Sequence, residues 1–266
     1  MSFETGTNSD NTRAFIANSD MADGALSLMD HIAALNQPMA LSNAEPAEGA
    51  VVGSNLLAFA EGVSRQNKED VMDSFLFATL VANRAANPED NSAAWYAKFN
   101  EVLSAIGWFS NSWSFARYRS THQRFSMDQA AIEILGSAIA AATLPGPASA
   151  AMLKVAGDAV KALKAQEKPL RLFERQTKFH NGASFRIGAC AESADGTVNL
   201  AMGAVNFLTS SNVTDVLFWE WNSTQVRTFR GENTLVLNTR MYAQNRLLIQ
   251  QKLGNNAKSA IEEFDI

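Results

Sequence analysis

Cysteine and histidine are scarce in this chain, which has one cysteine, Cys190, and three histidines in 266 residues. A single cysteine excludes an intramolecular disulfide and a cysteine-rich zinc site. The histidines, His31, His122 and His180, are far apart and do not have the spacing of metal ligands. We therefore predict no metal site, and no sequence pattern points to another cofactor.

The sequence also lacks the local motifs that mark many active sites. No GxGxxG, P-loop, HExxH or GxSxG pattern occurs. Sets of Ser, His and Asp can be assembled only from distant segments, so they carry no weight. We expect a protein that is not an enzyme. A hydrolase or transferase whose residues come from distant segments stays the alternative.

Charge is low and slightly acidic. Charged residues make up 18% of the chain, hydrophobic residues 47%, and the net charge is -5. No basic excess exists that would release counterions from phosphates, so nucleic acid is not an expected partner. Few charges also mean that more of the surface is neutral or is buried against a partner.

The N-terminus has neither the basic region nor the apolar region of a secretory signal. We therefore expect synthesis into the cytoplasm. Later release by lysis, or by a dedicated injection system, stays open because such routes need not leave an N-terminal mark.

The most unusual segment is residues 134–153, which carry no charge and are interrupted by Leu-Pro-Gly-Pro at 144–147. This pattern predicts two Ala-rich helices joined by a tight turn. The first arm is apolar nearly all round, so it needs shelter in protein or in lipid. A bilayer span needs about 20 continuous apolar residues, and the prolines break the run too early. A conventional transmembrane helix is excluded, whereas shallow insertion is not.

The central hairpin of a helical core is the simpler interpretation of this segment. If the hairpin instead meets lipid, its larger apolar side chains are the expected contacts. These membrane-contact candidates are Ile132, Ile134, Leu135, Ile139, Leu144, Met152, Leu153 and Val155.

Before the hairpin, helical spacing dominates. We predict a flexible segment over residues 1–19, then helices over 20–38, over 51–64, from Asn67, and over 87–106. Alternation over 113–119 predicts an extended segment within a stretch of aromatic residues and arginines at 108–125. Ser126 and Gln129 have the spacing of a capping box at the start of the hairpin.

After Pro169 the apolar period changes from 3.6 to 2. Short connections favour antiparallel neighbours. A helix from Thr239, capped by Asn238, runs to Gly254, and a last helical turn contains Ile261 and Phe264. The predicted strands are 170–174, 184–192, 197–208, 213–221, 224–230 and 234–238.

Two aromatic clusters, at 108–125 and at 217–221, are expected to lie mainly in the core. We expect 217–221 to be a strand covered on both sides, with Leu217, Trp219 and Trp221 on one face, and Glu220 to find a partner in Arg227 or Arg186. Surface exposure would instead mark subunit or partner contacts.

Cys190 shares a strand face with Arg186 and Glu192. A structural role is the simpler interpretation. A neighbouring arginine also favours the thiolate, so Cys190 is a candidate acylation site.

The sequence therefore predicts an α+β fold with three parts: a flexible segment at 1–19, a helical domain at 20–165 with the central apolar hairpin, and at 166–266 an antiparallel meander covered by C-terminal helices. For function we expect a membrane-interacting, toxin- or effector-like protein that uses the hairpin. The alternative is a non-enzymatic self-assembling or partner-binding protein. The expected partners are a lipid membrane, a protein, or further copies of the chain.

Overall fold

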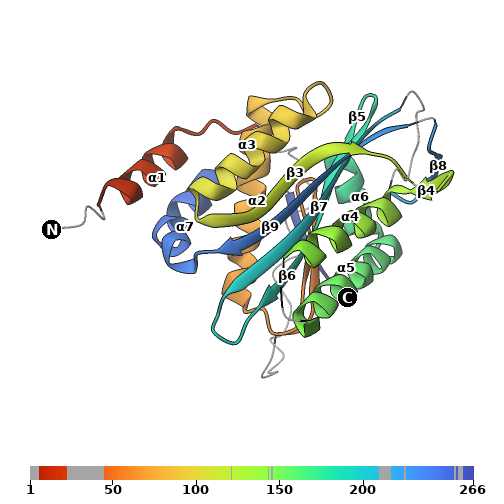
Figure 1. Cartoon of the computed structure of the whole chain (residues 1–266). Helices are drawn as coiled ribbons and strands as arrows, with labels where there is room; N and C mark the ends of the chain where they lie inside the picture. The colour runs from red at the N-terminus through yellow and green to blue at the C-terminus, as the bar shows by residue number, and fades with distance from the viewer. Residues whose placement is uncertain are drawn as a thin grey trace.

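A mixed sheet between two helical layers forms the body of the molecule in the computed structural model (Figure 1). The structure describes residues 6–22, 45–120, 122–142, 144, 146–209, 217–224, 226–254, 256 and 260–266. The helices are α1 (Gly6–Asn18), α2 (Arg65–Ala85), α3 (Ser92–Ala105), α4 (Met127–Ala141), α5 (Gly146–Ala165), α6 (Glu167–Thr177) and α7 (Thr239–Leu253).

The strands alternate with the helices along the chain. They are β1 (Glu48–Val52), β2 (Asn55–Phe59), β3 (Trp108–Tyr118), β4 (Arg124–Ser126), β5 (Lys178–Phe179), β6 (Gly182–Glu192), β7 (Val198–Leu208), β8 (Glu220–Asn222), β9 (Arg227–Leu237) and β10 (Ile261–Asp265). The main sheet has the order β10-β1-β2-β6-β7-β9-β3, with β5 beside β6. Its β2–β6 pair is parallel and its other pairs are antiparallel. Strands β4 and β8 form a separate small sheet.

Each face of the sheet is covered by its own helices. Helices α2, α3 and α7 bury one face, and α4, α5 and α6 bury the other (Figure 1). The hairpin formed by α4 and α5 is therefore an outer layer packed on the sheet. Helix α4 comes very close to β7, because a Cβ atom at Gly203 would lie 2.8 Å from the backbone nitrogen of Leu135.

The predicted separation into a helical first part and a β second part is wrong. An α+β fold is present, but strands from both sides of residue 165 pair in one sheet, as β2 does with β6. The domain boundaries themselves stay a prediction. The predicted helix at 51–64 is instead the β1–β2 hairpin, with Gly53 in the left-handed region (φ 55°) at its turn. Both faces of this hairpin are buried, so its residues show no alternation.

Three more local predictions need correction. Residues 170–174 are not a strand but part of α6. Pro169 is compatible with this helix because a proline in the first turn costs no hydrogen bond. The strands predicted at 224–230 and 234–238 form one strand, β9, which continues through Gly231. The expected last helical turn is β10. Most of the helix expected at 20–38 and residues 213–216 of the strand expected at 213–221 lie outside the described residues, and of 217–221 only Glu220 and Trp221 belong to a strand, β8.

Several other predictions are confirmed. The capping box of Ser126 and Gln129 opens α4, and Asn238 caps α7 through a bond from the backbone nitrogen of Met241. The predicted strands at 184–192 and 197–208 correspond to β6 and β7.

The 1–19 segment, predicted as flexible, contains α1, which contacts α7. Lys252 Nζ on α7 donates to the backbone oxygen of Ser19 at 3.0 Å.

Candidate functional site

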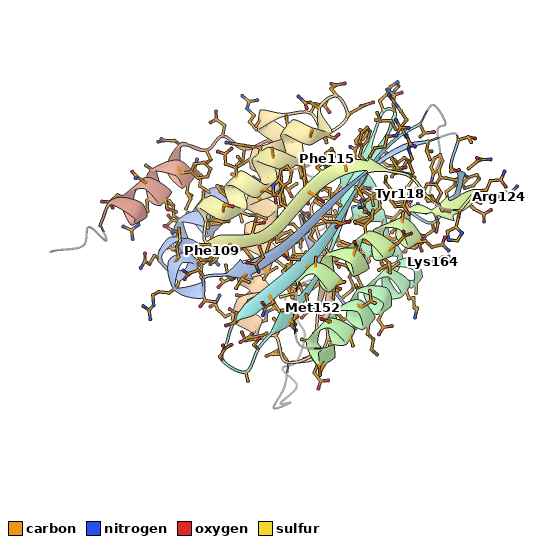
Figure 2. The ribbon with its side chains drawn as sticks, in the orientation of Figure 1. Phe109, Phe115, Tyr118, Arg124, Met152 and Lys164 are labelled. Atoms are coloured by element: carbon orange, nitrogen blue, oxygen red, sulfur yellow. The ribbon has the colours of Figure 1, made fainter. Side chains whose placement is uncertain are left out.

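Most of the residues predicted to contact lipid lie on the side of the hairpin that faces the sheet. Ile134, Leu135, Ile139, Met152 and Val155 are buried in the cluster between the hairpin and the sheet (Met152 is labelled in Figure 2). Ile132 and Leu144 are partly buried, and Leu153 is 41% exposed. The sheet therefore supplies the apolar shelter that the hairpin needs.

Small side chains occupy much of the outer face of the hairpin. Ala140, Ala141, Ala150 and Ala151 are exposed there, and exposed alanines leave little apolar area in water. An arm that is apolar all round can thus form an outer layer. Within the described ranges, no helix combines the length and the apolar character that a bilayer crossing requires.

Cys190 lies in the core on the α2 side of β6. Burial raises the pKa of its thiol, so the thiolate is disfavoured in the folded protein. Its strand neighbour Glu192 accepts a hydrogen bond from the backbone nitrogen of Ser64 at 2.8 Å. Acylation of Cys190 stays a prediction, and the folded structure encloses the sulfur atom.

The two edges of the main sheet differ in length and in charge. Strand β10 is five residues long and carries Glu262, Glu263 and Asp265. Glu263 pairs with Arg65 at 2.6 Å and Glu262 with Lys168 at 2.9 Å. Charged side chains of this kind protect an edge against pairing with another chain.

Strand β3, at the opposite edge, is eleven residues long and has no charged residue before Arg117. It pairs with β9 on one side, and seven of its described side chains are exposed. A long, neutral edge presents a row of backbone groups to which a further strand can bond.

Aromatic side chains gather along this edge. Phe109 is 57% exposed and Trp113 is 45% exposed. The Tyr96 ring on α3 lies 5.6 Å from Trp113 and 5.4 Å from Phe115, and Phe115 stacks on Phe229 of β9 at 6.0 Å. Figure 2 shows Phe109 and Phe115 along the outermost strand. We call Trp113, Phe115 and Phe229 the β3 edge surface.

A β-bulge and a glycine shape this surface. The bulge between Ser110 and Ser112 adds one residue to β3. Trp108 and Trp113, an odd number of positions apart, therefore both face the α2–α3 layer, where Trp108 packs on Phe75. A Cβ atom at Gly231 would lie 2.7 Å from the Tyr96 ring, so a glycine is required for that ring to lie on β9.

The two aromatic clusters of the sequence are only partly core. Trp108 is buried as predicted, whereas Phe109 and Trp113 are exposed. In the second cluster Leu217 and Trp221 are buried, but Trp219 is exposed because regular strand structure begins only at Glu220. Glu220 pairs with Arg124 at 3.5 Å, not with Arg186 or Arg227. The position of β3 at the sheet edge was not predicted.

A polar cavity of about 650 Å³ lies beyond the end of β3. Its lining includes Glu89, Asp90, Arg117 and Arg227, and Glu89 accepts bonds from the backbone nitrogen and Nδ2 of Asn181 at 2.8 and 2.7 Å. The lining contains no cysteine or histidine. In the described part of the chain, no three His, Cys, Asp or Glu residues cluster in a way that would hold a metal ion.

Comparison with models of known families gives no match, and comparison with curated proteins gives none either. Among solved structures, the Evf virulence factor is similar to this chain at a TM-score of 0.32 and 10% sequence identity. The match covers 79% of this chain and 84% of that protein. A TM-score this low does not establish a shared fold, and no function follows from it.

Proposed function

We propose that the protein is a non-enzymatic, self-assembling protein in which the β3 strands of two copies pair. The observation that carries this proposal is the long, neutral, aromatic edge of the sheet. The opposite edge has the charges that natural sheets use against such pairing, and β3 lacks them up to Arg117.

A second copy of the chain suits this edge for electrostatic reasons. Each copy carries a net charge of -5, so most orientations bring like charges together. Contact through residues 108–116 brings no charged side chains of β3 face to face. In an antiparallel pair centred on Trp113, the Trp113 side chains of the two copies lie side by side, and a pair of aromatic rings in contact is favourable.

The length of the edge is sufficient for a stable contact. Eleven strand residues span about 36 Å at about 3.3 Å per residue. A stable dimer buries roughly 1,200–2,000 Å² in total, and exposed tryptophan and phenylalanine are typical of its centre. Phe109 and Trp113 supply such side chains from each copy.

Sedimentation velocity over a range of protein concentrations tests the proposal. We expect the wild-type protein to dimerise at micromolar concentration and the Trp113→Lys variant to stay monomeric, because lysine places like charges at the centre of the pair. Leu247→Lys is the matched control, since Leu247 is 67% exposed and lies on α7, which packs on α1 and α2. This control should dimerise as the wild type does.

Two results would overturn the proposal. One is a wild-type monomer at the highest concentration reached. The other is a dimer that Trp113→Lys and Leu247→Lys weaken equally, which would mean that the contact is elsewhere. Circular dichroism of each variant shows whether the fold is kept.

Membrane contact is a second candidate, and the outer face of the hairpin favours it. Leu153 is exposed there beside exposed alanines, and no charged side chain occurs between residues 134 and 153. Five of the predicted contacts are buried, so deeper engagement requires the hairpin to leave the sheet. That costs about 1.5–3 kcal/mol for each large side chain unless lipid replaces the contact.

Flotation with neutral and anionic vesicles tests this second candidate. If the hairpin binds lipid, Leu153→Lys should reduce the floating fraction and Leu247→Lys should not. An absence of flotation at every pH where the protein is folded would exclude it. A toxin- or effector-like role stays a prediction.

A further inference from the structure

Arg186 is a buried cation in the middle strand of the sheet. Its side chain is only 1% exposed and lies on β6 under α3. The guanidinium carbon is 4.2 Å from the centre of the Trp95 ring and 5.4 Å from that of Phe99. Nε donates to Asn55 Oδ1 at 2.6 Å, and Nη2 donates to the backbone oxygen and Oγ of Ser54.

No carboxylate of the described residues forms an ion pair with Arg186. The other buried charges in the described part of the chain are paired. Lys68 bonds Glu48 at 2.8 Å, Asp70 bonds Arg246, and Glu174 pairs with Arg171 at 3.3 Å. An ion buried without a counter-ion is destabilising unless another partner compensates for its lost hydration.

Arg186 and Gln176 both line one cavity. The cavity has a volume of about 240 Å³, and Arg186, Gln176, Lys178, Ser184 and Asn83 are among its lining residues. No Asp or Glu belongs to that lining. The hydrogen bonds of Arg186 come from Nε and Nη2, and the buried Nε2 of Gln176 has no partner among the described residues. Unpaired buried donors are costly unless a ligand or water accepts from them.

The electrostatics of the cavity favour an anionic ligand. Burial lowers the pKa of Arg186 to about 9, because the charged form has lost its hydration. Lys178 adds a second cation at the cavity, although its Nζ is also 3.8 Å from Glu174 Oε1. An anion beside the guanidinium would restore the stabilisation that water no longer provides.

We propose that this cavity binds a small anion through a carboxylate or phosphate group, which accepts hydrogen bonds from Arg186 Nη1 and Gln176 Nε2. The inference is independent of the pairing of β3, because the cavity lies between the α2–α3 loop, the α6–β5 junction and β6. Small size and two donors fit one anionic group on a small molecule.

Calorimetric titration with sodium phosphate, and separately with sodium acetate, tests the proposal against sodium chloride at equal ionic strength. We expect saturable binding of phosphate or acetate and a rise in Tm that chloride does not give. Comparison of the phosphate titration with the acetate titration distinguishes a tetrahedral anion from a planar one. Arg186→Gln should weaken the binding at least tenfold. Equal responses to all three salts would overturn the proposal.

A built-in carboxylate gives a second test that does not require removal of Arg186. Gln176→Glu places an anion in the cavity, so we expect a higher Tm without added anion and a loss of the phosphate or acetate response. Gln123→Glu adds the same charge at an exposed position and should change neither property. A Gln176→Glu variant that is less stable than the wild type, or that keeps the full response, would contradict the assignment.

Discussion

At the scale of single residues, a buried ion pair joins α2 to α7. The carboxylate of Asp70 is fully buried, and Nε and Nη2 of Arg246 each donate to it at 2.6 Å. Gln66 Nε2, its other side-chain donor, is neutral and lies at 3.2 Å. Removal of the arginine would leave a charge in the core without compensation.

We predict that Arg246→Met lowers the free energy of unfolding by about 3–5 kcal/mol. Urea denaturation measures the change. The double variant Asp70→Asn/Arg246→Met removes the uncompensated charge, so it should recover a large part of the loss. Equal stability of the single and the double variant would mean that the pair acts only through packing.

Asp73, also on α2, gives a prediction about pH. Burial raises the pKa of its carboxyl to about 6 from the usual 3.8, and the nearby carboxylates of Asp70 and Glu69 add to the rise. Between these values the folded protein binds more protons than the unfolded chain, so this group lowers stability as pH rises through the window. Above pH 6 the folded protein carries the full cost of the ionised form.

Asp73→Asn should therefore stabilise the protein at pH 7.5 by about 1–2 kcal/mol, and the gain should shrink as the pH falls from about 6 towards 3.8. Thermal unfolding at several pH values measures this. The exposed substitution Asp90→Asn is the control and should have little effect. A gain from Asp73→Asn that does not change with pH would exclude the proposed cause.

At the scale of elements, sequence patterns predicted those segments whose signals are local. The capping box at Ser126, the cap at Asn238 and the alternation in β6 depend on residues a few positions apart. The β1–β2 hairpin escaped prediction because both of its faces are buried, which removes the period-2 signal. Pro169 was taken as the start of a strand region, although a first-turn proline is equally compatible with α6.

The candidate sites depend on contacts that no local pattern encodes. Arg186 meets Ser54 and Asn55, which are more than 130 positions away in the sequence. The extended character of 113–119 was predicted, but whether a strand is central or at an edge depends on the order of the whole sheet. Strand order is a long-range property, so the open edge was visible only in the fold.

The contact between α4 and β7 gives the prediction at this scale. A Cβ atom at Gly203 would lie 2.8 Å from Leu135 N and 3.0 Å from Ala131 O, both backbone atoms of α4. Gly203→Ala should therefore push the hairpin from the sheet and lower the free energy of unfolding by about 1–3 kcal/mol.

Gly157→Ala is the matched control, because no atom lies within 4 Å of the added methyl group. Alanine in the interior of α5 should raise stability by about 1 kcal/mol. Denaturant unfolding compares the two. A Gly203→Ala variant as stable as the wild type would mean that α4 shifts without loss of packing.

At the scale of the whole molecule, the two edges of the sheet differ: charged side chains protect the β10 edge, whereas the β3 edge is neutral up to Arg117. Charges on β10 are engaged with Arg65 and Lys168, whereas Phe109 and Trp113 on β3 face water. This asymmetry limits growth: an assembly that uses only β3 closes as a pair, because a two-fold contact consumes the same edge in both copies. An extended fibre would need β10 as well.

The proposed pair also has a predictable dependence on salt. Copies that each carry a charge of -5 repel one another over a Debye length of about 30 Å at 0.01 M salt, which falls to about 8 Å at 0.15 M. A contact through the neutral part of β3 has few ion pairs to lose by screening. We therefore expect the dimer Kd, measured by sedimentation, to fall roughly three- to tenfold between these salt concentrations. A Kd that rises with salt would instead indicate an ionic contact such as the acidic β10 edge, and Trp113→Lys would then leave it unchanged.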